Sequence, residues 1–392
     1  MNRHFLLDFF LISLVFGLII AVSYFFLGRI GEINIDSVVT RQLAAKESML
    51  FASGVTNEMI DYKKALHSRL RPAIVVVGSS RAMGFRGNFF NRQMVNWGGT
   101  VSSLARLEVV INEILRQKHR PEYALILVDV WWMNSKIIGA TTANGFASYP
   151  NFPDMLTLVK AAEIVSRDYA KVRRAAFARN TDRLGLYAIM KDDGFAADGS
   201  WHYSGMVSRP NTRSEQDITE QLRLAAPPAE ADEKFSFLRE HEGDLALVGR
   251  LVSIIKTLKS NSIEPVVILP PLEKSMVNYL SKNSSNDRFK KMADSFAAAL
   301  IEFHDYSDAS SLQPDHINKD CEFVDEFHAG DVINARLLLD MWSRTAQAGL
   351  KASIDSSFLK QFIVAKAGFA EGDDRYRHNR PEVNFRGIMC HP

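Results

Sequence analysis

The sequence predicts an α/β domain with a mostly parallel sheet, arranged as a three-layer sandwich behind an N-terminal transmembrane helix. Two observations predict this class: a long apolar run opens the chain, and short apolar strands then alternate with longer helical segments. Strands that alternate with helices in this way indicate a parallel sheet with helices on both faces. The 392 residues, 47% hydrophobic and 23% charged, contain enough apolar material for a sizeable core.

The apolar run extends from Phe5 to Leu27 and reads FLLDFFLISLVFGLIIAVSYFFL. About 20 such residues cross the hydrocarbon layer of a bilayer as a helix. The run ends in bulky aromatic residues, whereas a cleaved signal peptide has a shorter apolar core and small residues at its cleavage site. We therefore expect an uncleaved signal anchor. Lys and Arg residues flank it too evenly to fix its orientation.

The pattern along the chain divides it into four parts. Residues 1–30 are expected to form a cytoplasmic tip and the anchor, and 31–69 a helical stalk, with a first packing helix as the alternative. The α/β domain covers 70–348 and carries a long insertion at about 140–235, after the second core strand. Residues 349–392 form a C-terminal extension whose polar end, from 370 onward, is expected to be loosely held. The insertion contains an amphipathic helix over 154–178, the aromatic stretch Trp201-His202-Tyr203 and an exposed linker at 225–233.

The core elements follow from apolar periodicity. Continuous β-branched runs are typical of strands buried on both faces, and a repeat of three and four is typical of helices. Strands are expected at 73–77, 123–130, 265–269 and 301–305, and helices at 102–118, 236–260, 287–301 and 330–347. Ligands bind beyond the carboxyl ends of the strands in such sheets. Gly78-Ser79-Ser80, Asp129-Val130-Trp131 and Pro270-Pro271 all follow strands.

One group of residues suits nucleophilic catalysis. Of the ten histidines, only His328 has an aspartate three residues upstream, Asp325, in the stretch VDEFHAGD. On a helical turn, side chains with this spacing share a face, so the carboxylate fixes the imidazole tautomer and leaves the other ring nitrogen free to accept a proton. A serine hydroxyl at the end of the first strand then becomes an effective nucleophile.

These motifs resemble those of the SGNH (GDSL-type) hydrolase superfamily. The resemblance rests on GSS after the first strand, NWGG (96–99), LVDVWWMN (127–134) and DEFH (325–328). It is closest to the membrane-anchored branch that includes envelope polysaccharide O-acetyltransferases and the D-alanyl-lipoteichoic-acid acyl-transfer protein. The resemblance implies a flavodoxin-like sheet order, with Ser80 as the nucleophile, His328 as the base and Asp325 as its orienting carboxylate.

The resemblance also implies an oxyanion hole, formed by the backbone N–H groups of Ser80 and of Gly98 or Gly99. In the family, an asparagine in the third motif supplies a further donor. This chain has Val-Asp-Val-Trp-Trp-Met-Asn there, and Asn134 lies too far along for a simple match. Loss of one oxyanion donor costs about 2.7–4 kcal/mol in a known protease.

Four other residues near the strand ends are candidate substrate contacts. Arg81 suits an anionic group on the substrate, but the sequence favours a structural salt bridge as its role. Trp131 and Trp132 suit stacking on sugar rings, with core packing as the alternative. Asn134 completes this set.

Composition narrows the functional classes. A net charge of +2 and the absence of long Lys/Arg runs predict no nucleic-acid partner. The two cysteines, Cys321 and Cys390, are too few for a disulfide framework and do not have the spacing of a zinc site; whether they pair stays open. Acyl transfer through serine and histidine requires neither a metal nor an organic cofactor.

The sequence thus predicts a single-pass protein of a bacterial inner membrane, with its globular domain on the periplasmic or extracellular side. The resemblance implies an acyl-ester hydrolase or O-acyltransferase that acts on a cell-envelope polysaccharide. One alternative is a non-catalytic accessory protein that binds a glycan or a membrane-bound acyltransferase. A second alternative is a structural anchor in an envelope assembly.

Overall fold

The computed structural model describes residues 3–45, 49–56, 59–133, 154–178, 181–208, 244–274, 276–278, 287–313, 319–375 and 390. The expected linker at 225–233 and most of the remaining insertion lie outside this set. The chain forms two compact units, one from residues 1–65 and 147–197 and the other from 66–146 and 198–392. The units therefore do not follow the expected linear order, because part of the insertion joins the anchor and the stalk.

In the first unit, α1 (Arg3–Ile30) is one helix that is long and apolar enough to cross a membrane. Helix α2 (Ile35–Ala44) follows, and the Asn34 side chain caps its first turn. Strand β1 (Leu50–Phe51) then pairs in parallel with β5 (Arg183–Leu184) and antiparallel with β6 (Gly194–Phe195). The expectation of a helical stalk over 31–69 is wrong in part, because β1 interrupts the helices before α3 (Ile60–Leu70).

The expected helix over 154–178 consists of two helices, α6 (Met155–Arg167) and α7 (Tyr169–Phe177). They separate at Asp168, whose carboxylate accepts a hydrogen bond from the Lys171 N–H and so caps α7. With α8 (Leu186–Lys191), they pack on the last turn of α1 through a cluster that includes Leu27, Ile30, Ala161, Val172, Ala176 and Leu186.

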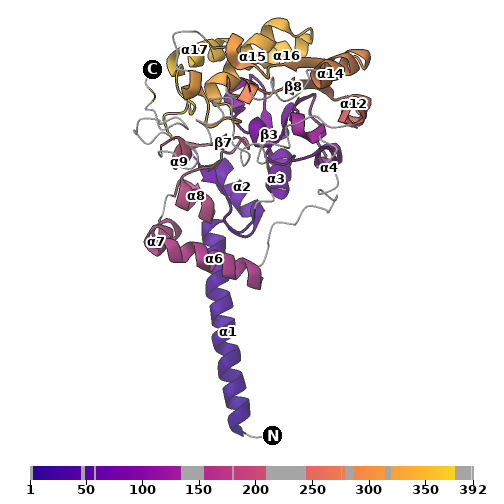
Figure 1. The fold of residues 1–392 in the computed structure, drawn as a ribbon. Coiled ribbons are helices and arrows are strands. Elements are labelled where there is room, and N and C mark those ends of the chain that lie inside the picture. The colour runs from indigo at the N-terminus through magenta and orange to yellow at the C-terminus, as the bar shows by residue number, and fades with distance from the viewer. Residues whose placement is uncertain are drawn as a thin grey trace. The chain divides into compact units, whose positions relative to one another are not determined.

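The second unit is built around a five-stranded sheet in which every neighbouring pair is parallel. Figure 1 labels two of its strands, β3 and β8. Its strand order is β3-β2-β4-β8-β9. The strands are β2 (Ile74–Gly78), β3 (Met94–Gly98), β4 (Tyr123–Leu127), β8 (Glu264–Leu269) and β9 (Glu302–Asp305). The chain turns from one side of β2 to the other between β3 and β4, and ligands bind at such a reversal of strand order.

Helices pack against this sheet. One face buries alternate strand residues such as Val76, Leu125 and Ile268 against residues of α15 (Asp331–Arg344), α16 (Ala348–Ser353) and α17 (Ser356–Lys366). Helix α12 (Asp244–Ser260) contacts β8 and also packs on α4 (Leu104–Arg116) and α14 (Asp287–Ala298).

The C-terminal extension belongs to this core. Leu350, Ile354 and Leu359 are buried in the same cluster as the strands, and α17 packs on α15. The prediction of a loosely held tail from residue 370 is wrong for residues 370–372, which are buried, and Glu371, 1% exposed, accepts hydrogen bonds there. Asp374 and Arg375 are exposed. Residues 376–389 lie outside the described chain.

Candidate active site

The turn after β2 places Ser80 at the switch point of the sheet. The Ser79 hydroxyl oxygen accepts a hydrogen bond from the Arg81 N–H and starts the short 3₁₀ turn Ser80–Ala82. Gly78 and Gly98 are register partners in β2 and β3. A Cβ at Gly78 would lie 2.8 Å from Ala82 Cβ, and one at Gly98 would lie 2.8 Å from the Met83 nitrogen. The two glycines therefore allow this turn to lie across the strand ends.

A tight loop before α15 holds the other two residues. An antiparallel bridge between Phe323 and Ala329 closes the loop. The Asp325 carboxylate accepts hydrogen bonds from the N–H groups of Phe327 and His328, both at 2.8 Å. The sequence spacing predicts a helical turn here, and that expectation is wrong: the aspartate side chain organises a non-helical loop, as aspartates do in turns.

Ser80, His328 and Asp325 form a continuous hydrogen-bonded relay. His328 Nε2 lies 2.7 Å from Ser80 Oγ, and His328 Nδ1 lies 2.7 Å from each carboxylate oxygen of Asp325. With the Nδ1–H donated to Asp325, Nε2 is the acceptor for the serine proton. The histidine and aspartate side chains are 22% and 21% exposed, so the relay is sheltered yet open to a ligand. The expected convergence of the three side chains is observed.

The electrostatic environment suits proton transfer to His328. Burial lowers the pKa of the imidazole, but the neighbouring Asp325 carboxylate more than offsets this effect and raises the pKa above its ordinary value. Burial likewise acts to raise the pKa of Asp325, and the attraction of His328 with the loop hydrogen bonds lowers it below its ordinary value. Asp325 therefore stays ionised while the imidazole takes a proton.

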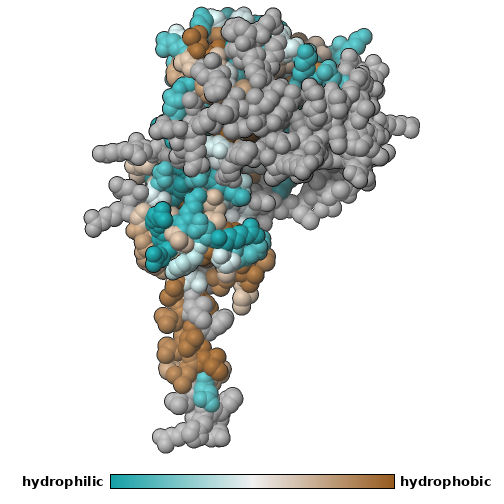
Figure 2. All heavy atoms as spheres, turned by 60° about the vertical axis from the view of Figure 1, so that its left-hand side comes forward, coloured by the Kyte–Doolittle hydropathy of each residue, from teal (hydrophilic) through white to brown (hydrophobic). Residues whose placement is uncertain are grey.

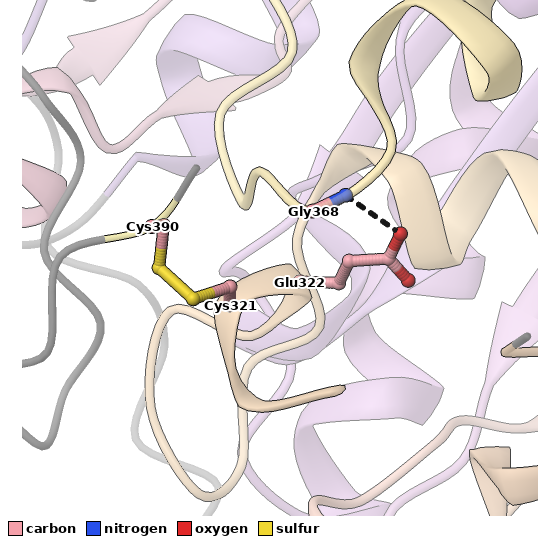
Figure 3. Close-up of a disulfide and its surroundings, with 4 residues drawn as sticks. All are labelled: Cys321, Glu322, Gly368 and Cys390. Atoms are coloured by element: carbon pink, nitrogen blue, oxygen red, sulfur yellow. Dashed lines mark hydrogen bonds between the residues drawn. A yellow bond between two sulfur atoms is a disulfide. The ribbon is translucent and has the colours of Figure 1, made fainter. Parts of the chain in front are cut away.

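The segment that leads into the Asp325–His328 loop is held by two kinds of contact. A disulfide joins Cys321 to Cys390, with Cα atoms 5.7 Å apart. The adjacent Glu322 is fully buried, and its carboxylate accepts hydrogen bonds from Arg336 and from the Gly368 N–H. Figure 3 shows the disulfide and the Glu322–Gly368 contact side by side. These contacts hold the segment from which the Asp325–His328 loop projects.

Arg81 forms a buried salt bridge with Asp129, so the structural role expected from the sequence is confirmed and the assignment of Arg81 as a substrate contact is wrong. It is 3% exposed and pairs with Asp129 at 2.9 Å. Its remaining bonds go to the carbonyls of Pro270, Pro271 and Phe327. Arg81 therefore connects the nucleophile turn to the ends of β4 and β8 and to the histidine loop. Burial dominates both partners, lowering the pKa of Arg81 and raising that of Asp129.

The structure contradicts the assignment of Gly98 and Gly99 as free oxyanion donors. The Gly98 N–H donates to Asn96 Oδ1 at 2.6 Å, and the Gly99 N–H donates to the Ser79 carbonyl at 2.9 Å. Both N–H groups are used to attach the β3 end to the nucleophile turn. The Ser80 N–H, at the first position of its turn, has no acceptor among the described residues and is the donor left for an oxyanion.

Trp131 and Trp132 differ in how far their side chains are exposed. Trp132 is 1% exposed, so its assignment as a substrate contact is wrong. Trp131 is half-buried in the turn Val130–Met133, with its ring edge-on to Phe327 at 6.1 Å and 5.5 Å from the Arg81 guanidinium. It lies against two residues that support the relay and remains a candidate contact. Asn134 lies outside the described residues.

Sequence reasoning did not find the position of Tyr203 beside the relay. Its half-buried ring lies 6.1 Å from the His328 ring, centroid to centroid, just after β7 (Trp201–His202). Glu371 holds this segment, because its carboxylate accepts from the Tyr203 N–H at 3.1 Å and contacts His202 Nδ1 at 3.1 Å. The signal available was only a run of three aromatic rings in the insertion.

A buried charged cluster lies behind Tyr203. Arg86 pairs with Asp331 at 2.5 Å and with Glu371 at 3.5 Å. Two carboxylates thus share one guanidinium. Burial raises the pKa of Asp331 to about 7 despite Arg86, and burial also raises the pKa of Glu371. Burial lowers the pKa of His202 to about 3, so this histidine is neutral in the fold.

Comparisons with protein-family models, with curated proteins and with solved structures give no match to this chain. Within the described ranges, no three His, Cys, Asp or Glu side chains are grouped to hold a metal ion. The fold and the geometry of Ser80, His328 and Asp325 are therefore the features of this chain that indicate a function. In this arrangement, the Ser80 hydroxyl can give its proton to His328, as a serine nucleophile requires.

Proposed function

We propose that the protein is a membrane-anchored serine esterase or O-acyltransferase, with a three-layer SGNH-like domain that acts on acyl esters of a cell-envelope glycan. The observation that carries the proposal is the relay Asp325–His328–Ser80, whose three contacts are each 2.7 Å. A general base at this distance from a hydroxyl accelerates attack by about 10²–10⁴-fold. The acyl-ester substrate class and the glycan come from the motif resemblance.

In the first half of the reaction, Ser80 Oγ forms a bond to the acyl carbon while its proton passes to His328 Nε2. The Ser80 N–H donates to the carbonyl oxygen as it becomes negative. The bond to the leaving alcohol then breaks, and the alcohol oxygen takes the proton from His328. The product is an acyl ester on Ser80, and Asp325 stabilises the imidazolium in between.

In the second half, an acceptor hydroxyl attacks the acyl-enzyme. His328 removes the acceptor proton and returns it to Ser80 Oγ as the acyl–serine bond breaks. Water as the acceptor makes the protein an esterase, and a sugar hydroxyl makes it an O-acyltransferase. Trp131 and Tyr203, both half-buried, are the side chains we assign to contact the sugar. The ring of Tyr203 lies beside that of His328, and the ring of Trp131 lies against Phe327 in the histidine loop.

The anchor and the disulfide support a location outside the cytoplasm. Helix α1 is long enough for a membrane span, and an 18-residue stretch of the apolar segment that starts at Asp8 has a mean hydropathy of 2.6. The Cys321–Cys390 disulfide fits an oxidising compartment, because cytosolic thiols are kept reduced. We therefore place the α/β unit on the periplasmic or extracellular side of a bacterial inner membrane.

A specific observation favours the accessory protein as the second candidate. The N–H groups of Gly98 and Gly99 are both engaged, and the third motif lacks the family asparagine at the matching position. With one remaining oxyanion donor, the same fold would bind a glycan or a membrane-bound acyltransferase without turning over an ester.

Turnover of an aryl acetate by the purified full-length chain separates the two candidates. The enzyme predicts release of the phenol by wild type, loss of release in Ser80→Ala and retention in Ser253→Ala, a control at an exposed serine on α12. A sugar alcohol added as acceptor accelerates release if acyl transfer is the second step. Equal release by wild type and Ser80→Ala, with unchanged circular dichroism, would exclude the serine enzyme and favour the accessory protein.

A further inference from the structure

Helices α6 and α7 expose an unusual amount of apolar surface. Outside α1, the described chain has ten large hydrophobic side chains that are strongly exposed, and half of these are in α6 and α7. They are Met155, Leu156 and Val159 on α6, and Tyr169 and Phe177 on α7. Isolated exposed apolar residues are normal on a soluble surface, but a group of this kind marks an interaction site.

The two helices are fastened to one end of α1. Leu27 and Ile30 of α1 pack with Val172 and Ala176 of α7, and Arg29 Nε donates to the Ala176 carbonyl at 3.0 Å. Figure 1 shows α6 and α7 lying crosswise at this end of the long helix. We call residues 155–177 the collar.

We call the exposed apolar stretch of α1, from Asp8 to Phe25, the bare part of α1. The collar packs on α1 just after this stretch ends. Within the apolar window of α1 only 6% of residues are buried, whereas Leu27 is 2% exposed against the collar. From Asp8 to Phe25 the helix rises about 27 Å, close to the hydrocarbon thickness of about 30 Å. Tyr24 and Phe25, both exposed, mark the level at which aromatic residues concentrate at a bilayer interface.

The composition of the collar fits the headgroup region. Tyr169, Arg173 and Phe177 lie four residues apart and form one exposed row on α7, with the Arg173 guanidinium 6.0 Å from the Tyr169 ring. Residues 154–178 contain five basic and three acidic side chains. Aromatic and basic residues on one amphipathic helix are typical of helices that lie in a membrane interface. Figure 2 shows apolar side chains along the bare part of α1 and again around the collar, beside hydrophilic ones.

We propose that the collar lies in the interface of the bilayer that α1 spans, with Val159 and Phe177 among the lipid headgroups and upper acyl chains. The occupant of the exposed apolar face is therefore lipid. The inference rests on the membrane anchoring proposed above for α1. The collar would be a second membrane contact beside α1. Because the collar packs on α1 and lies crosswise to it, keeping the collar in the interface fixes the tilt and depth of α1.

Single fluorophores in the full-length chain test this proposal. Cysteine is introduced at Val159, Phe177, Leu14 in the bare part of α1, and Thr40, an exposed control on α2. Each variant is labelled with an environment-sensitive dye without reductant, so that the Cys321–Cys390 pair stays closed. The proteins are reconstituted in vesicles of phosphatidylethanolamine and phosphatidylglycerol that contain no other protein.

The expected result is several-fold stronger quenching of the Val159 and Phe177 probes than of the Thr40 probe by lipids spin-labelled near the headgroup. Aqueous iodide should show the opposite order. If the Leu14 probe reports lipid while the Val159 and Phe177 probes behave like the Thr40 probe, the proposed membrane contact of the collar is overturned. The proposed membrane anchoring by α1 is then retained. If the Leu14 probe also reports water, the proposed anchoring fails with it. Probes shielded from both quenchers would mean that protein covers this face, which also overturns the proposal.

Discussion

His328 Nε2 lies 2.7 Å from the Ser80 hydroxyl oxygen, although 248 positions separate the two residues. Each is placed by its own backbone device. Ser80 stands on a turn that two paired glycines allow to cross the strand ends, and His328 stands in a loop that Asp325 closes with its carboxylate. The proton path from serine to imidazole is therefore formed before any substrate arrives.

The proton path predicts a pH profile. Serine attack requires neutral His328, so ester turnover rises with pH and reaches half its plateau above 6.5, because Asp325 raises the pKa of the imidazole. Asp325→Asn removes this attraction while burial remains, so the midpoint moves to lower pH. The plateau falls by as much as about 10⁴-fold, as in Ser-His-Asp proteases. Turnover measured across pH gives both quantities.

The control for this profile is Glu326→Gln, which removes a carboxylate from the same loop. It should keep the wild-type midpoint and plateau to within a few-fold. An Asp325→Asn profile that overlays the wild-type profile would show that this carboxylate does not act on the imidazole.

Arg81 predicts a stability effect. Arg81→Ala leaves Asp129 buried without its counter-ion and frees the carbonyls of Pro270, Pro271 and Phe327. Breaking such a buried pair costs about 3–5 kcal/mol of unfolding free energy. Urea denaturation followed by circular dichroism measures the change.

The matched double variant Arg81→Met/Asp129→Leu removes both charges and keeps apolar volume. It should unfold at a higher urea concentration than Arg81→Ala, because no lone charge remains buried. If the double variant is less stable than Arg81→Ala, the unpaired charge of Asp129 is not the cause of the destabilisation in Arg81→Ala.

The disulfide predicts sensitivity to reductant. It joins residues 69 positions apart, and a cross-link of this span stabilises a fold by about 2–4 kcal/mol. Reduction should therefore lower the urea midpoint of the wild-type protein. The double variant Cys321→Ser/Cys390→Ser should unfold at the reduced midpoint with or without reductant. An unchanged wild-type midpoint on reduction would contradict the pairing.

The buried cluster around Arg86 predicts how stability depends on pH. Ion-paired carboxylates usually stabilise a fold as the pH rises, whereas Asp331 should destabilise it. Asp331 has a folded-state pKa of about 7, whereas an unfolded aspartate titrates near pH 3.9. Between these values the folded chain holds a proton that the unfolded chain has lost, so this group reduces stability as the pH rises. Asp331→Asn should remove that slope from urea midpoints measured between about pH 4 and pH 7. Parallel slopes in the two proteins would contradict the assignment.

Much of the sheet could be predicted because its strands are continuous apolar runs. Residues 73–77, 123–130, 265–269 and 301–305 correspond closely to β2, β4, β8 and β9. Strand β3 was not predicted, because Asn96 interrupts its apolar pattern. That side chain lies buried and donates to the carbonyls of Ala82 and Phe85, a contact that only the folded chain defines.

The site was predictable where residue chemistry is specific and unpredictable where it depends on neighbours. Ser80 stands out because its hydroxyl directly follows a predicted strand. Asp325 and His328 stand out because a carboxylate and an imidazole occur three residues apart. The salt bridge of Arg81 could be predicted, but its partner Asp129 and its carbonyl acceptors could not. Gly98 was misassigned, because nothing local indicates that its N–H group finds an internal acceptor. The position of Tyr203 beside His328 could not be predicted, because Glu371, far along the chain, holds Tyr203 there.

Covalent labelling with a fluorophosphonate tests the central claim most directly. The reagent captures a serine only when a neighbouring base takes its proton, as fluoride leaves phosphorus and a phosphorus–oxygen bond forms. We predict that wild type and Ser253→Ala become labelled, that the modified residue is Ser80, and that Ser80→Ala and His328→Ala remain unlabelled. Equal labelling of wild type and Ser80→Ala, or no labelling of folded wild type, would contradict the account.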